Sequence, residues 1–134
     1  MIIAYRIEYK DEKGPFRCEE GGIFEDKYPW FQKIIDKHLS FFPTPYEEGM
    51  GCLHRSLKCA YKSKEDLLYW IGQKNILKLK ELGFSFWKLY LKNEAVSVGK
   101  QQIVFTPIGV KKKIEITKRL INYKPQNHVQ PRSN

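Results

Sequence analysis

Hydrophobic and polar residues alternate with a period of two at both ends of the chain. Residues 2–9 are rich in β-forming types and stop at the turn "KDEKGP", a pattern that predicts a first strand. From Phe84 onward the same period returns. It predicts strands at "FSFWKLYL", "AVSV" and "QQIVF", and a last strand at either "KKIEIT" or "KRLINY".

The middle of the chain has the 3.6-residue period of a helix. The first helix is predicted to begin near Tyr28, with Asp26 as its cap, and to end before Pro43 and Pro45. Its side chains form one apolar stripe, made of Phe31, Ile34, Ile35, His38, Leu39 and Phe42. Residues 16–25, which contain two adjacent glycines, are predicted to be irregular.

Two further helices are predicted after a short strand over residues 57–61. Ser63 is a good N-cap for the first of them, and Gly72 closes it. The second covers residues 75–82, with Gly83 as its stop. Strands at both ends and helices between them predict a single α+β domain over residues 1–123, with one mixed or mainly antiparallel sheet and helices packed on it. Residues 124–134 are predicted to be a flexible tail.

Composition agrees with a globular protein. The chain has 134 residues, of which 42% are hydrophobic and 29% are charged. No apolar run approaches the roughly 18 residues that span a bilayer, and the N-terminus lacks the features of a signal peptide. Three cysteines, an odd number, argue against a disulfide framework. We therefore expect a cytoplasmic protein without a membrane partner.

The formal net charge is +9, and part of the excess lies at Lys111, Lys112 and Lys113. Such a balance favours contact with nucleic acid, an anionic membrane or an acidic protein. Drift of a lysine-rich genome would produce the same excess. Aromatic residues beside a lysine could also stack on nucleic-acid bases, and the best such set is Phe84, Phe86 and Tyr90 with Lys88. However, that strand is apolar on both faces, which favours a place inside the sheet.

Other clusters of reactive residues are weak candidates for chemistry. Cys52, His54 and Cys59 do not have a zinc-finger spacing, so no metal is expected. A cysteine nucleophile would need a histidine that the sequence does not place beside it. The acidic pairs Glu19-Glu20 and Glu47-Glu48 could act in acid–base catalysis only if burial separated their pKa values, and we expect them to be solvated loop residues instead.

Two short stretches are stronger candidates for a binding site. Tyr5 and Arg6 lie in the first strand, where Arg6 offers a fork for phosphate or carboxylate or else pairs with Glu8. Gln101 and Gln102 precede the apolar run "IVF". Successive side chains of a strand point to opposite faces, so one amide could enter a cleft while the other meets solvent. Alternatively, both glutamines lie at the solvated start of the strand.

The motifs "AYRIE", "GPF", "PTPYEE", "AYKSKEDLLYW", "LGFSFWKLYL" and "GKQQIVF" occur in this order. Together they resemble a family of small uncharacterised phage and prophage proteins over residues 4–105. The family's histidine before the prolines is replaced here by Phe42, and its acid by Glu48. This resemblance implies a phage-encoded accessory protein.

The order of Tyr5-Arg6, Ser63 and "QQIVFTP" is also similar to that of ADP-ribosyltransferases. That likeness implies that Tyr5, Arg6, Ser63 and Gln101 bind NAD, and that Gln102 stands where the family has its catalytic Glu. A neutral amide does not supply the negative charge of that carboxylate. Either another residue is the catalytic acid, with Glu8 and Glu94 as possible substitutes, or the protein binds a nucleotide without catalysis.

Three functions follow as expectations from these resemblances. The first is a nucleotide-binding cleft, with NAD as cofactor, that acts on a host macromolecule. The second is a non-enzymatic inhibitor of host defence or of a nucleic-acid machine, which would present its basic surface to a host protein or nucleoprotein complex. The third is a structural or assembly protein of the phage particle.

Overall fold

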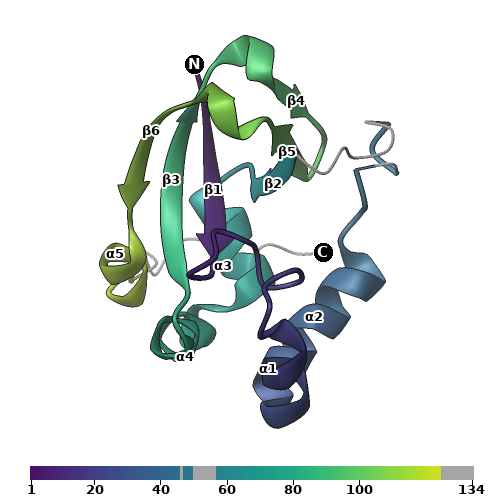
Figure 1. Ribbon diagram of the computed structural model, residues 1–134, viewed down its shortest axis with the longest axis vertical. Helices are drawn as coiled ribbons and strands as arrows, with labels where there is room; N and C mark the ends of the chain where they lie inside the picture. The colour runs from purple at the N-terminus through teal and green to yellow at the C-terminus, as the bar shows by residue number, and fades with distance from the viewer. Residues whose placement is uncertain (46, 50–56, 125–134) are drawn as a thin grey trace.

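A computed structural model describes residues 1–45, 47–49 and 57–124 of the chain. Its centre is a six-stranded antiparallel sheet with the order β4-β5-β2-β1-β3-β6 (Figure 1). The strands are β1 (Ile2–Glu8), β2 (Lys58–Tyr61), β3 (Ser85–Leu91), β4 (Val96–Val98), β5 (Gln102–Phe105) and β6 (Val110–Glu115). The α+β prediction is confirmed, and the described sheet pairs are all antiparallel.

Helices gather toward one end of the sheet. They are α1 (Gly21–Lys27), α2 (Pro29–Phe41), α3 (Lys64–Ile71), α4 (Ile76–Leu82) and α5 (Thr117–Ile121), with short 3₁₀ turns η1 (Gln73–Asn75), η2 (Asn93–Ala95) and η3 (Pro107–Gly109). In Figure 1, α4 and α5 lie below the sheet and α1 and α2 lie to its lower right. No helix among the described residues is long and apolar enough to cross a bilayer.

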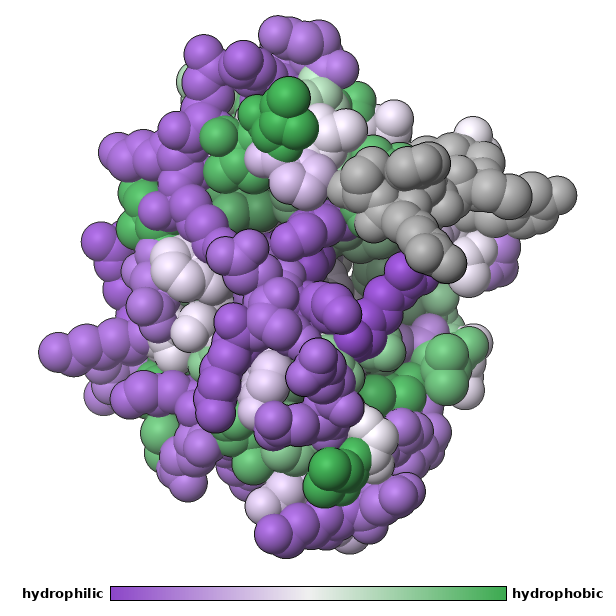
Figure 2. All heavy atoms as spheres, in the orientation of Figure 1, coloured by the Kyte–Doolittle hydropathy of each residue, from purple (hydrophilic) through white to green (hydrophobic). Residues whose placement is uncertain are grey.

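The two faces of the sheet bury separate apolar clusters. Ile7 and Phe86 face the helices and pack with Leu67, Trp70 and Leu79, among others, in the larger cluster. On the other face the sheet curls over a smaller cluster made of Ala4, Ala60, Leu89, Leu91, Ile103 and Phe105. The prediction that both faces of β3 are apolar is therefore confirmed over most of its length. Hydrophilic side chains cover most of the surface seen in Figure 2, where hydrophobic ones form separate patches.

Local stop and start signals act as the sequence predicts. The Ser63 side chain accepts a hydrogen bond from the backbone N–H of Asp66, at 3.0 Å, and so caps α3. Gly83 ends α4 with φ +109°, a left-handed conformation that favours glycine. Of the two sequences proposed for the last strand, "KKIEIT" contributes most of β6.

Two segments differ from the prediction. Residues 16–25 are not irregular throughout, because α1 begins at Gly21, and Asp26 lies inside α1 instead of capping the next helix. Phe24 explains the difference, since its ring packs at 5.7 Å from Phe31 and 6.0 Å from Phe84. The alternative strand "KRLINY" instead contributes to the short helix α5, which buries Leu120. From residue 125 the predicted tail lies outside the described residues.

Candidate functional site

Strands β1 and β2 pair at Tyr5 and Tyr61 and then separate. A continued antiparallel register would place Arg6 opposite Ala60, with backbone hydrogen bonds between the strands. Instead, the guanidinium of Arg6 reaches across, and its Nη1 donates to the carbonyl oxygen of Cys59 at 2.6 Å. A side chain therefore bridges the opening between the two strands.

Arg6 is held on three sides. Its Nε donates to Glu8 at 2.8 Å and its Nη2 to the carbonyl oxygen of Glu12 at 3.3 Å. Glu8 also pairs with Lys113, at 2.5 Å. Arg6 is 8% exposed, so this ion pair is buried. Of the two roles that the sequence left open for Arg6, the pairing with Glu8 is present in the structure.

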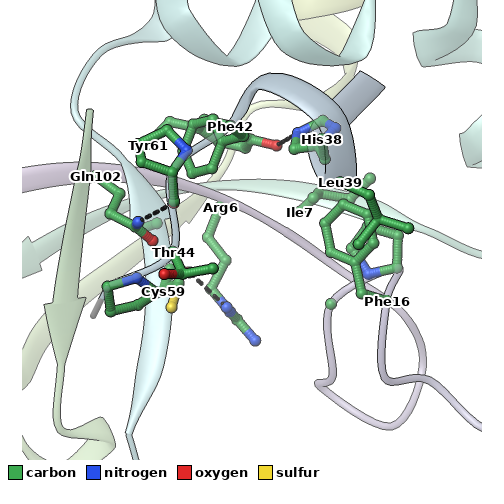
Figure 3. Close-up of a pocket in the computed structure, with 15 residues that line it drawn as sticks. Arg6, Ile7, Phe16, His38, Leu39, Phe42, Thr44, Cys59, Tyr61 and Gln102 are labelled. Carbon is green, nitrogen blue, oxygen red and sulfur yellow. Dashed lines mark hydrogen bonds between the residues drawn. The ribbon is translucent and has the colours of Figure 1, made fainter. Parts of the chain in front are cut away.

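An apolar hollow of about 230 Å³ opens beside this bridge. One part of its wall comes from the turn after β1, the end of α2 and the segment that follows it, with Phe16, Leu39, Phe42 and Pro43 among the lining residues, and the rest comes from strands β1, β2 and β5. Figure 3 shows Arg6 between Phe16 and Leu39 on one side and Gln102 on the other. Arg6 and Gln102 both line this hollow, so the structure brings together two of the predicted site residues.

His38 and Tyr61, which both line the apolar hollow, form a neutral hydrogen-bonded pair (Figure 3). The His38 ring lies 2.8 Å from the Ile34 carbonyl through Nδ1 and 2.7 Å from the Tyr61 hydroxyl through Nε2. This fits Nδ1–H donating to Ile34 while Nε2 accepts from Tyr61. Burial lowers the pKa of His38 to about 4, and the charge of Lys37 acts in the same direction. Burial also raises the pKa of Tyr61, so both groups are uncharged at neutral pH.

The two glutamines hold the chain that follows α2. Gln102 is 3% exposed, and its Nε2 donates to the carbonyl oxygen of Pro43 at 2.7 Å. Gln101 uses its backbone N–H, which donates to the Glu48 carboxylate at 2.7 Å. The sequence predicts one amide in a cleft, and Gln102 occupies that place. Its hydrogen bond is to the hollow's own wall.

A second, polar hollow of about 600 Å³ adjoins the first. Its charged lining comprises Arg6, Asp11, Glu12, Lys13, Arg17 and Lys58. Both hollows are lined by Arg6, Gly14, Phe16 and Cys59. We call the two together the Arg6 cleft. Because Arg6 is buried and already engaged by Glu8 and two backbone carbonyl groups, the cations most available to a ligand are Lys13, Arg17 and Lys58.

The other predicted site residues lie outside the Arg6 cleft. Tyr5 follows strand alternation, so its side chain points away from that of Arg6 and packs against the larger core cluster. Ser63 caps α3. Lys111, Lys112 and Lys113 lie in the edge strand β6, where Lys112 stacks on Tyr90 and Lys113 pairs with Glu8. Of the two substitute acids, Glu8 is in that ion pair and Glu94 lies in η2.

Sequence reasoning missed most of the apolar lining. Leu39 and Phe42 belong to a helical stripe that predicts only core packing, and the prolines after it predict only a helix end. Phe16 follows the Gly14-Pro15 turn without any periodic signal. No group of three metal-ligating side chains gathers within the part of the chain that the structure describes, and Cys52 and His54 lie outside that part.

Comparisons with known proteins support a family assignment. Searches of curated proteins and of solved structures found no match, so the ADP-ribosyltransferase likeness stays a prediction. A family model described as "Bacteriophage T4 Y00F protein" matches residues 1–118. That range includes the whole sheet and every residue that lines the Arg6 cleft. The chain therefore belongs to the bacteriophage T4 Y00F protein family, as its motifs predicted for a phage protein.

Proposed function

We propose that this phage accessory protein binds a nucleotide in the Arg6 cleft, with the base in the apolar hollow and the phosphates in the polar hollow. The observation that carries the proposal is the adjacency of the two hollows around Arg6. One hollow is apolar and the other is lined by cations, which matches the flat base and the charged phosphates of a nucleotide. NAD and ADP-ribose are the ligands that the motif order favours.

The apolar hollow suits a flat, uncharged ring. Phe16, Leu39 and Phe42 provide apolar contact, and the neutral His38–Tyr61 pair adds no charge. Its volume of about 230 Å³ admits a single ring system and excludes a whole dinucleotide. Burial of such a ring stabilises the complex by roughly 25 cal/mol for each Å² of apolar surface removed from water.

The polar hollow suits the phosphate groups. Lys13, Arg17 and Lys58 bring three positive charges, against the carboxylates of Asp11 and Glu12. Asp11 is already engaged, since its two oxygens accept from the backbone N–H groups of Lys13 and Glu19. Arginine and lysine both bind phosphate, arginine through a bidentate fork.

The proposal is for binding without group transfer. The described lining of the apolar hollow contains no carboxylate. Gln102, the residue that the ADP-ribosyltransferase likeness aligns with the catalytic Glu, is neutral and donates to Pro43. An amide in that position shapes the hollow and does not supply the negative charge that an oxocarbenium-like transition state needs.

A thermal-shift series with NAD, ADP-ribose and AMP tests this function. A ligand with a Kd near 0.1 mM, present at 1 mM, would stabilise the fold by about 1.4 kcal/mol, roughly 4 °C in melting temperature. Leu39→Ala should abolish most of the shift and Phe41→Ala should not, because both side chains are exposed on α2 but only Leu39 lines the hollow.

The phosphate half has its own control pair. Arg17→Gln should weaken NAD and ADP-ribose binding several-fold, whereas Arg119→Gln removes the same charge from α5, outside the cleft. An absence of any shift at 5 mM for all three ligands would end the nucleotide proposal.

The rim of the apolar hollow favours a second candidate, a non-enzymatic inhibitor that docks on a host protein. Phe16 and Leu39 line the hollow and remain 47% and 78% exposed, as expected of residues that a partner covers. Leu39→Asp should abolish capture of one defined host protein, whereas Ile108→Asp, at a similarly exposed apolar position on η3, should not. Capture that survives Leu39→Asp would contradict this candidate.

A further inference from the structure

A second surface lies on the sheet, apart from the Arg6 cleft. In the register of β1, β3 and β6, Ile3 pairs with Tyr90 and Tyr90 with Lys112, while Tyr5 pairs with Lys88. Directly paired residues of antiparallel strands share a face. We call these five residues the Tyr90 surface. They continue the helix-covered face of the sheet into a part that reaches solvent, where Ile3 is 39% exposed and Lys112 is exposed.

We propose that the Tyr90 surface binds single-stranded nucleic acid. Two cations flank one aromatic ring: the Nζ atoms of Lys88 and Lys112 lie 5.4 Å and 5.7 Å from the ring centroid of Tyr90. A base would stack on the Tyr90 ring, and the two ammonium groups would move from the ring to the adjacent phosphates. Tyr5, in the neighbouring strand and only partly buried, offers the edge of a second ring.

The charge distribution across the sheet supports a polyanion at this face. The acidic residues of β1, β3 and β6 are Glu8 and Glu115. Glu8 pairs with Ser85 and Glu115 with Trp87, so both belong to the opposite face. There Glu8 is the ion-pair partner of both Arg6 and Lys113. Lys88 and Lys112 have no carboxylate partner among the described residues, so their charge remains available.

The shape of the surface selects a single strand over a duplex. A duplex buries its base faces in its own stack, and proteins read it with elements that enter a groove. An open sheet with tyrosines and lysines offers stacking to unpaired bases, as sheet-based RNA-binding modules do. An acidic protein would use the same lysines but would gain less from the rings.

Fluorescence anisotropy with the full chain tests the proposal, using labelled dT12 and a 12-base-pair duplex in 50 mM salt. We expect dT12 to bind more tightly than the duplex. Lys88→Gln/Lys112→Gln should weaken dT12 binding at least tenfold and reduce the salt slope by about 1.4, the value for two phosphates of a single strand. Lys33→Gln/Lys80→Gln removes the same charge from α2 and α4, and should change binding by less than threefold.

The aromatic contribution is tested separately at Tyr90. Tyr90→Leu should weaken dT12 binding by between about fivefold and a hundredfold, the range for loss of one stacked base, and Tyr90→Phe should bind like the original chain. Circular dichroism confirms that each variant is folded. No binding of dT12 at 10 μM protein would overturn the proposal. The proposal would also be overturned if the two double lysine variants lost dT12 affinity equally or if Tyr90→Leu had no effect. Displacement of labelled dT12 by polyglutamate as effectively as by unlabelled dT12 would overturn it too.

Discussion

The side-chain amide of Gln102 lies 2.7 Å from the carbonyl oxygen of Pro43, and this bond ties strand β5 to the segment that leaves helix α2. The two residues are 59 positions apart in the chain. Both line the apolar hollow, so the bond fixes one of its walls. The stability of the fold and the shape of the candidate site therefore depend on the same contact.

Gln102→Leu should destabilise the fold by about 1–2 kcal/mol, because it leaves the Pro43 carbonyl without its donor in a mostly apolar place. Gln101→Ala provides the control. Gln101 contributes its backbone N–H to Glu48, which alanine retains, so its effect should stay within about 0.5 kcal/mol. Urea unfolding measures both changes, and an equal loss in the two variants would show that the Gln102 side chain has no special role.

Arg6 should be essential to the fold itself. Arg6→Met leaves Glu8 buried with only Lys113 as partner, and should cost about 3 kcal/mol of unfolding free energy. The double variant Arg6→Met/Glu8→Met should recover much of that loss, since it also removes the buried carboxylate that has lost its Arg6 partner. Lys113→Gln breaks the outer pair, whose lysine is 32% exposed, and should cost less than about 1 kcal/mol. Double-variant losses that simply add would contradict a coupled pair.

His38 should make the folded state sensitive to acid. Its folded pKa is about 4, below the ordinary value of 6.5, because burial disfavours the charged ring. Below pH 6.5 the unfolded chain takes up a proton that the folded chain does not, so stability is lost as pH falls from 6.5 toward 4. At pH 5 the loss relative to neutral pH is about 2 kcal/mol. The His38→Gln variant lacks this proton uptake, so its free energy of unfolding should fall by about 2 kcal/mol less between pH 7 and pH 5. Urea unfolding at pH 7 and pH 5 measures the difference.

Gly109 should tolerate no side chain while Ala95 is present. A Cβ at Gly109 would lie 2.2 Å from the Cβ of Ala95, where η3 meets η2. Gly109→Ala should therefore cost about 2 kcal/mol through overpacking. Adding Ala95→Gly removes the clash, so the double variant should be more stable than Gly109→Ala alone. If both variants melt at the same temperature, the clash is relieved in another way.

Ser63 offers a test of its predicted role in NAD binding. Ser63→Ala removes the oxygen that accepts from the Asp66 N–H, and should cost about 1 kcal/mol. Ser63→Asp is also a good cap and should keep the stability. Because Ser63 lies outside the Arg6 cleft, nucleotide affinity should be the same in Ser63→Asp as in the original chain. A large loss of affinity in that variant, measured by calorimetry, would favour the role in NAD binding.

The sequence by itself determined the periodic elements. Alternation over residues 2–9 and from Phe84 gives β1 and β3, and Ser63 and Gly83 mark helix ends by local chemistry. These signals depend on a residue and its close neighbours in the chain, so they can be read without the fold. The same holds for the motifs that predicted a phage protein family.

Only the tertiary structure decided how the site is assembled. The Arg6 bond to Cys59 spans 53 positions and the Gln102 bond to Pro43 spans 59. Helix α1 forms in a glycine-containing segment because Phe24 packs against Phe31 of the next helix and against Phe84, which lies far along the chain. The sequence grouped Tyr5 with Arg6, whereas strand alternation sends them to opposite faces. Contacts between distant segments also determine where β1 and β2 stop pairing, and no local pattern in the chain encodes that geometry.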